Sequence, residues 1–203
     1  MEFSPHELIE TILQFRNPET ANDARNQIMQ FLTNPQSIGM LFDIILMPEI
    51  DDFIYQIAII CVNQFCDINK EIISEEMLDF LRSRLMDVLR SFRDSIPFSI
   101  LLNAISTAIE YFSSDWVEIQ EFAFEIDTSN IIYHIKLLSM LIPFFSDETI
   151  SEKTDFFSEL LSGIFQSDES NFPESTNNLE IQCSSVEFAV KLVSWSAATV
   201  CSG

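Results

Sequence analysis

The chain has little glycine. Only three glycines occur among its 203 residues, namely Gly39, Gly163 and Gly203. Glycine-rich phosphate loops and dinucleotide-binding turns need closely spaced glycines, because only glycine lets the backbone approach a phosphate so closely. The sequence therefore argues against nucleotide-binding folds of these classes.

Basic residues are also scarce. Ten lysines and arginines stand against 32 aspartates and glutamates, which gives a formal net charge of −22. A chain this acidic repels the phosphates of nucleic acids and anionic membrane surfaces. We therefore expect no nucleic-acid partner and no membrane partner. Two interpretations of the acidity remain open. The acidic surface attracts basic segments of other proteins, or the negative charge only keeps the protein soluble.

Residues that carry catalytic or metal chemistry are few and scattered. The two histidines, His6 and His134, lie far apart in the sequence. Cys61 and Cys66 are five residues apart, which places them about 140° apart around a helix, so they are poorly set to share a metal ion. The sequence predicts no enzyme, no cofactor and no metal site, and it predicts core cysteines of a reduced, intracellular protein.

Long hydrophobic runs are missing as well. The most apolar stretches, Ile57–Val62 and Leu137–Phe145, are far shorter than the roughly 20 residues of a membrane-spanning helix. The N-terminus lacks the basic and apolar regions of a secretory signal peptide. We expect the protein in the cytoplasm and nucleus.

Apolar residues recur at helical spacing through most of the chain, between clear start and stop signals. Ser4-Pro5-His6-Glu7 predicts a capping box, and Asp51-Asp52 and Ser74-Glu75-Glu76 predict further helix starts. The predicted helices begin near residues 4, 20, 34, 52, 74, 95, 115, 128, 147 and 179. The eighth is expected to reach residue 145, the ninth to run to residue 165 and the last to residue 200. The polar composition of residues 166–178, interrupted by a proline, predicts a polar loop or a disordered insert.

The predicted helices form pairs that repeat every 30 to 40 residues. Helix pairs at this period are typical of an α-solenoid of the HEAT or armadillo type. The sequence therefore predicts an all-α, right-handed solenoid of about five helix pairs over residues 1–203. A compact helical bundle is the alternative fold.

Residues 21–92 resemble the N-terminal domain of the importin-β (karyopherin-β) family. The resemblance lies in three successive stretches: ANDARNQIMQFLTNPQSIGMLFDIIL, MPEIDDFIYQIAIICVNQF and ISEEMLDFLRSRLMDVL. The stretch that begins at Trp116-Val117-Glu118 is similar to the fourth repeat of import receptors, in the importin beta-three branch. The chain departs from the family at Asn63-Gln64, where a Lys-Asn pair is usual, and at Tyr55, where an arginine is usual.

The resemblance implies a nuclear transport receptor. Such a receptor binds Ran-GTP through its N-terminal repeats and carries basic protein cargo through nuclear pores, where it meets Phe-Gly nucleoporins. It implies a monomer, and import as the direction. Because receptors of this family have many more repeats, it also implies the N-terminal part of a longer protein. A generic HEAT-repeat scaffold is the alternative function, and a small helical-bundle enzyme is a weaker one.

Three of the predicted second helices show a polar stripe about 60° wide among otherwise apolar positions. The stripe residues proposed to bind a Ran-type GTPase are Asp23, Gln27, Gln56, Asn63, Ser99, Asn103 and Glu110. Side by side, the three helices would present these residues on one inner face. The simpler explanation is that each helix turns one side to water. Two phenylalanine pairs could either pack in the core or form pockets for Phe-Gly segments, and we favour packing in the core. The pairs are Phe144-Phe145 and Phe156-Phe157.

Overall fold

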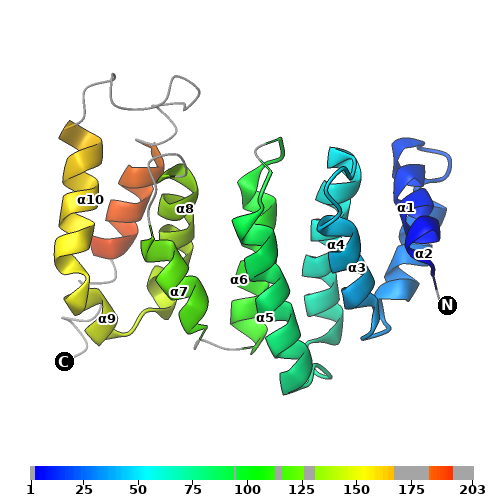
Figure 1. Ribbon diagram of the computed structural model, residues 1–203, viewed down its shortest axis with the longest axis horizontal. Coiled ribbons are helices and arrows are strands. Elements are labelled where there is room, and N and C mark those ends of the chain that lie inside the picture. Colours follow the sequence, from blue (N-terminus) through cyan, green and yellow to red (C-terminus); the bar gives the residue numbers. More distant parts are fainter. Residues whose placement is uncertain (1–2, 94, 113–115, 126–130, 167–182, 194–203) are drawn as a thin grey trace. The chain divides into compact units, whose positions relative to one another are not determined.

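The computed structural model describes residues 3–93, 95–112, 116–125, 131–166 and 183–193, where every regular element is a helix (Figure 1). The prediction of an all-α protein is confirmed. The helices are α1 (Pro5–Leu13), α2 (Ala21–Leu32), α3 (Ser37–Ile45), α4 (Asp52–Asn69), α5 (Glu75–Arg90), α6 (Phe98–Phe112), α7 (Val117–Phe124), α8 (Ile131–Leu141), α9 (Asp147–Glu152) and α10 (Thr154–Gln166), with 3-10 turns η1 (Gln14–Arg16) and η2 (Ile142–Phe144). A further helix spans residues 183–193. Among the described residues, no helix combines the length and the apolar character needed to cross a bilayer.

The predicted caps hold the helix starts. Oγ of Ser4 accepts the backbone N–H of Glu7 at 3.3 Å, while the Glu7 carboxylate accepts the backbone N–H of Ser4 at 2.8 Å. This reciprocal pair satisfies two N–H groups that have no partner inside the helix, and it lowers the pKa of Glu7. Asp51 caps α4 by accepting the backbone N–H of Phe53, and Ser74 caps α5 by accepting that of Met77, each without the reciprocal bond. Local sequence therefore fixes where these helices begin.

Several helix ends differ from the prediction. Helix α4, which the apolar spacing predicts to end near Cys66, continues to Asn69, and α8 stops at Leu141 because Pro143 cannot continue a regular helix. The single helix predicted over 147–165 is wrong, since Lys153 separates α9 from α10. Residues 183–193 lie within the predicted last helix, whereas residues 167–178 of the predicted polar loop lie outside the described residues.

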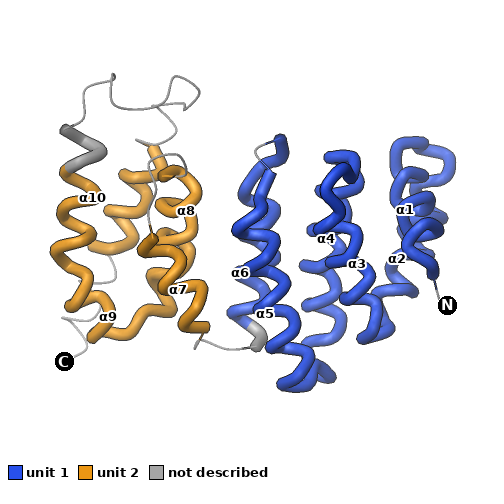
Figure 2. The backbone as a smooth tube through the Cα atoms, in the orientation of Figure 1, with its two compact units in different colours: residues 1–115 blue, residues 116–203 orange. Residues whose placement is uncertain are grey.

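The chain divides into two compact units, residues 1–115 and residues 116–203 (Figure 2). In the first unit, α1 pairs with α2, α3 with α4 and α5 with α6. The first helix of each pair also contacts the first helix of the next pair, and the second helices contact one another in the same order. The first helices α1, α3 and α5 therefore form one row, and the second helices α2, α4 and α6 form another. The description of residues 1–203 as one solenoid stays a prediction.

The second unit is held by aromatic side chains. The ring of Phe124 on α7 lies 5.4 Å from that of Phe145, 5.3 Å from Phe156 and 5.9 Å from Phe157. Phe157 also contacts Phe188 of the 183–193 helix, at 5.6 Å. Edge and offset contacts of this kind stabilise packed aromatic rings. The core role favoured for these phenylalanines agrees with this packing.

Asn69 ties the first two helix pairs together. Its side chain is 1% exposed, and its Nδ2 donates to the carbonyl of Leu32 at 2.8 Å and to that of Phe65 at 2.9 Å. Leu32 ends α2, so Asn69 satisfies a carbonyl that has no partner within its own helix. Asn69 is the last residue of α4, so these bonds come from the part of the helix that extends beyond its predicted end.

Replacing Asn69 by alanine is expected to lower the free energy of unfolding of the first unit by about 2 kcal/mol, because the buried carbonyl of Leu32 loses its donor and the second hydrogen bond, to the carbonyl of Phe65, is lost as well. Asn69→Asp is expected to cost more, since a carboxylate donates nothing and faces two carbonyl oxygens. Urea unfolding followed by circular dichroism measures the loss. Asp67→Ala, an exposed change on the same helix, is the control, and equal stability of the Asn69 and Asp67 variants would contradict the role assigned to Asn69.

Candidate protein-binding site

The seven residues proposed from the sequence lie on the row of second helices. Asp23 and Gln27 are on α2, Gln56 and Asn63 on α4, and Ser99, Asn103 and Glu110 on α6. Helix α4 touches both α2 and α6, so the structure brings the three helices together. Asp23, Ser99, Asn103 and Glu110 are exposed, while Gln27, Gln56 and Asn63 are half-buried. The row offers amides, hydroxyls and carboxylates to a partner.

One acceptor on this row is unsatisfied. Oδ1 of Asn63 is shielded from solvent and accepts no hydrogen bond in the described part of the chain. A buried acceptor without a donor is costly, and a donor from a bound partner would reach this oxygen only after the side chain turns outward. An amide in this position can present either its oxygen or its nitrogen, since the two ends interchange by a flip.

Tyr55 is a core residue, although the family resemblance aligns it with a surface arginine. Its side chain is 2% exposed, and burial raises the pKa of its hydroxyl. The guanidinium of Arg93 lies over its ring at 4.9 Å from the centroid. Arg93 therefore places a positive charge beside Tyr55, and it does so from the turn between α5 and α6.

The turn between α3 and α4 is held by arginines from both sides. Arg93 donates to the carbonyls of Ile50, Met47 and Pro48 at 2.6, 2.8 and 3.0 Å. From η1, Arg16 donates to Asp51 at 2.7 Å, which lowers the pKa of that carboxyl. The start of α4, and with it the polar row, is thereby fixed against the neighbouring helix pairs.

A groove between α2 and α4 lies beside the polar row and was missed by the sequence prediction. It holds about 270 Å³ and is lined by Phe15, Arg25, Ile28, Met29, Ile57, Ile60, Cys61 and Gln64. Ile57 and Ile60 are only half-buried, although they lie in a helix whose opposite side is the core. The signal in the sequence that could have revealed this groove is that α4 carries apolar residues on two opposite sides of the helix.

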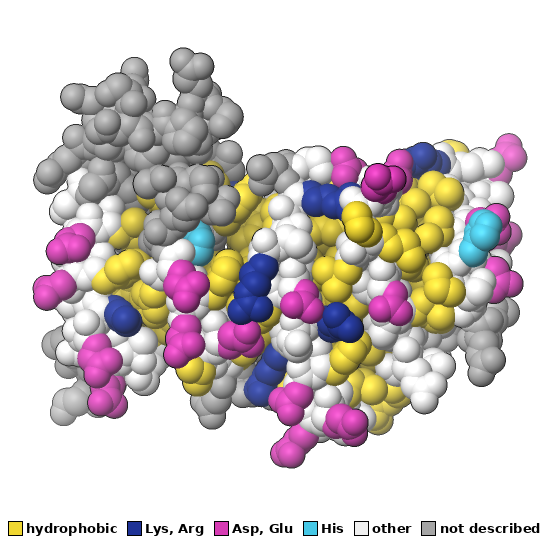
Figure 3. Space-filling view, viewed as in Figure 1, with side chains coloured by type: hydrophobic (Ala, Val, Ile, Leu, Met, Phe, Trp, Pro, Cys, Tyr) yellow, Lys and Arg dark blue, Asp and Glu magenta, His cyan; other side chains and the backbone are white. Residues whose placement is uncertain are grey.

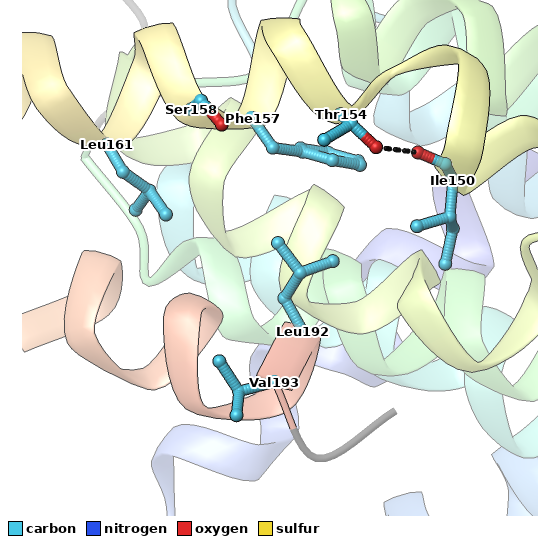
Figure 4. A pocket seen from close by; sticks show the side chains of 7 residues that line it. All are labelled: Ile150, Thr154, Phe157, Ser158, Leu161, Leu192 and Val193. Atoms are coloured by element: carbon cyan, nitrogen blue, oxygen red, sulfur yellow. Dashed lines mark hydrogen bonds between the residues drawn. The ribbon is translucent and has the colours of Figure 1, made fainter. Parts of the chain in front are cut away.

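A second groove lies within the second unit. It holds about 310 Å³ between α9, α10 and the 183–193 helix, and Figure 4 shows its side chains converging from these helices. The lining residues are Ile150, Thr154, Phe157, Ser158, Leu161, Leu192 and Val193. Its lining is mostly apolar, with hydroxyls from Thr154 and Ser158, and Val186, Val190 and Val193 of the 183–193 helix are exposed. No charged side chain lines it.

The histidines and cysteines do not form a chemical centre in the described part of the chain. His134 is buried with its ring stacked on Phe122 at 5.2 Å, and His6 lies on the surface near Glu10. Burial raises the pKa of the Cys61 and Cys66 thiols to about 12, so both are protonated and unreactive at neutral pH. Among the described residues, no cluster of three or more His, Cys, Asp or Glu side chains is arranged to hold a metal ion.

Charged side chains on the face drawn in Figure 3 are mostly acidic and are spread between apolar patches. No family model, curated protein or solved structure matches this chain. The candidate site therefore rests on the arrangement of the second helices and on the two grooves.

Proposed function

We propose that this protein is a right-handed HEAT-like solenoid that binds another protein along its second helices. In this proposal it is a nuclear transport receptor of the importin-β type, and its partner on that row is Ran in the GTP form. The observation that supports the proposal is the side-by-side row of α2, α4 and α6 with polar residues on all three helices. The nucleotide belongs to the partner, so the protein itself needs no cofactor and catalyses no reaction.

The proposed mechanism is competition between two ligands. Ran-GTP on the row and a basic cargo protein on the same solenoid would each lower the affinity of the receptor for the other, since coupling between binding sites is reciprocal. The net charge of −22 favours basic cargo and makes its association sensitive to salt. The apolar groove of the second unit is the described feature that best fits a phenylalanine of a Phe-Gly nucleoporin.

The direct test is titration of the purified chain with Ran that carries a non-hydrolysable GTP analogue and, in parallel, with Ran that carries GDP. We expect the GTP form to bind and the GDP form to bind much more weakly, at physiological and at low salt. Equal binding of the two forms, or no binding of either to the folded chain, would favour the generic HEAT-repeat scaffold instead.

The double variant Gln56→Arg with Asn103→Arg tests the row itself. Two long cationic side chains on neighbouring helices would block close approach, and we expect the affinity for Ran-GTP to fall about tenfold or more, equivalent to at least about 1.4 kcal/mol. Isothermal titration calorimetry measures the affinity, and circular dichroism checks that helicity is unchanged. The matched control is Ser83→Arg with Asp43→Asn, which makes the same change in charge at exposed positions of first helices. An unchanged affinity of the row variant would refute the assignment.

A further inference from the structure

The groove between α2 and α4 differs in charge from the rest of this acidic chain. None of its eight lining residues is a carboxylate, and its polar side chains are Arg25 and Gln64. The remainder of the lining is apolar and comes from η1, α2 and α4. The groove therefore combines an apolar floor with one positive charge, in a protein of net charge −22.

Arg25 is the only cation of the chain without a partner, and all ten lysines and arginines lie within the described ranges. Arg16, Arg82, Arg84, Arg93 and Lys191 form ion pairs, and Lys153 lies over the ring of Phe124. Lys70, Arg90 and Lys136 also make contacts. Since 32 acidic residues compete for ten basic ones, an exposed arginine left unpaired beside an apolar groove is unusual.

The size of the groove limits what can occupy it. Pockets for small-molecule ligands usually hold about 300–1,000 Å³, and this groove holds about 270 Å³. It is therefore large enough for one or two protein side chains and too small for most complete ligands. An apolar anchor that enters such a groove beside a charge-assisted contact is a common way for helical proteins to bind a segment of another protein.

We propose that this groove binds a protein segment in which a large apolar side chain lies next to a carboxylate. The apolar side chain packs between Met29, Ile57 and Ile60, and the carboxylate accepts hydrogen bonds from the guanidinium of Arg25, an arrangement that favours bidentate pairing. The amide of Gln64 is placed to bond the backbone of the segment. A basic segment is repelled by Arg25, and a second copy of this chain is repelled by its own net charge.

This inference goes beyond the proposed function, because it assigns a ligand chemistry to a groove whatever the partner of the polar row is. A partner that covers the row would reach the groove as well, since Gln56 and Asn63 of the row share α4 with Ile57, Ile60 and Gln64. The experiment below uses no GTPase, so its result is independent of the titration with Ran.

The test is selection of random twelve-residue peptides, displayed on phage, against the 203-residue chain. We expect the enriched peptides to place Phe, Leu, Ile, Met or Trp next to Asp or Glu. Synthetic copies carrying a fluorescent label are then measured by anisotropy. Replacing the acidic residue of the peptide by its amide should weaken binding at least tenfold, and so should Arg25→Gln in the protein, whereas Arg25→Lys should retain part of the affinity.

The control variant is Asn26→Glu, which makes the same change in net charge at the next position of α2, outside the groove. It should bind the peptides within about twofold of the parent chain. Because Arg25 is exposed and unpaired, its variants should melt at the parent temperature, which shows that the fold is intact. Failure to enrich any peptide, enrichment of basic or uncharged peptides, or equal binding by Arg25→Gln and Asn26→Glu would each overturn the proposal.

Discussion

Replacing Arg93 by alanine is expected to lower the free energy of unfolding of the first unit by about 2–3 kcal/mol, since hydrogen bonds from a charged donor are worth about 1.5–3 kcal/mol and several are lost together. The side chain is 25% exposed, and its guanidinium reaches three carbonyls of the turn between α3 and α4. Its contact with the Tyr55 ring is lost as well. The ion pair with Asp52, at 3.7 Å and half open to water, adds little.

The measurement is urea unfolding of the full chain, followed by circular dichroism, with hydrogen exchange to locate the effect. Peptides from the start of α4 should exchange faster in the variant. Arg82→Ala is a matched control, because Arg82 lies on α5 with 24% exposure but makes only one local ion pair, with Asp79 at 3.6 Å. We expect Arg82→Ala to change stability by less than about 0.5 kcal/mol.

The lysine variant separates charge from geometry. Arg93→Lys keeps the positive charge, but a single ammonium group cannot span three carbonyls as the planar guanidinium does. We expect it to recover less than half of the stability lost in Arg93→Ala. Full recovery would show that the charge alone matters and would contradict the role of the three hydrogen bonds.

Leu85→Asp is expected to abolish the cooperative unfolding transition of the first unit. Leu85 is 1% exposed on α5, which packs against α3 and α6. A carboxylate there would take the place of a fully buried apolar side chain, and an unpaired buried charge costs several kcal/mol. This is comparable to the whole stability of a typical domain, about 5–15 kcal/mol.

The comparison for Leu85→Asp is Ser83→Asp, an exposed change on the same helix. Thermal melting by circular dichroism should show a normal transition for Ser83→Asp and a lost or strongly shifted one for Leu85→Asp. A native-like melt of Leu85→Asp would contradict the placement of this side chain between α3, α5 and α6, and with it the third helix pair.

The sequence by itself determined the local features of this protein. The capping signals at Ser4, Asp51 and Ser74 mark real helix starts because they act through the nearest backbone N–H groups, which lie within three residues. The all-helical content follows from apolar spacing, which fixes which side of each helix avoids water. The scarcity of glycine, histidine and basic residues is a property of composition and needs no fold.

Only the tertiary structure decided how residues far apart in the chain cooperate. Arg93 reaches back 43 residues to Ile50, and Asn69 reaches back 37 residues to Leu32. Neither contact follows from helical spacing, because each depends on how one helix pair stacks on the previous one. The groove beside the unpaired Arg25 also depends on how the helices stack. A periodic pattern shows which side of α2 and of α4 faces water. The space between the two helices exists only once both are packed.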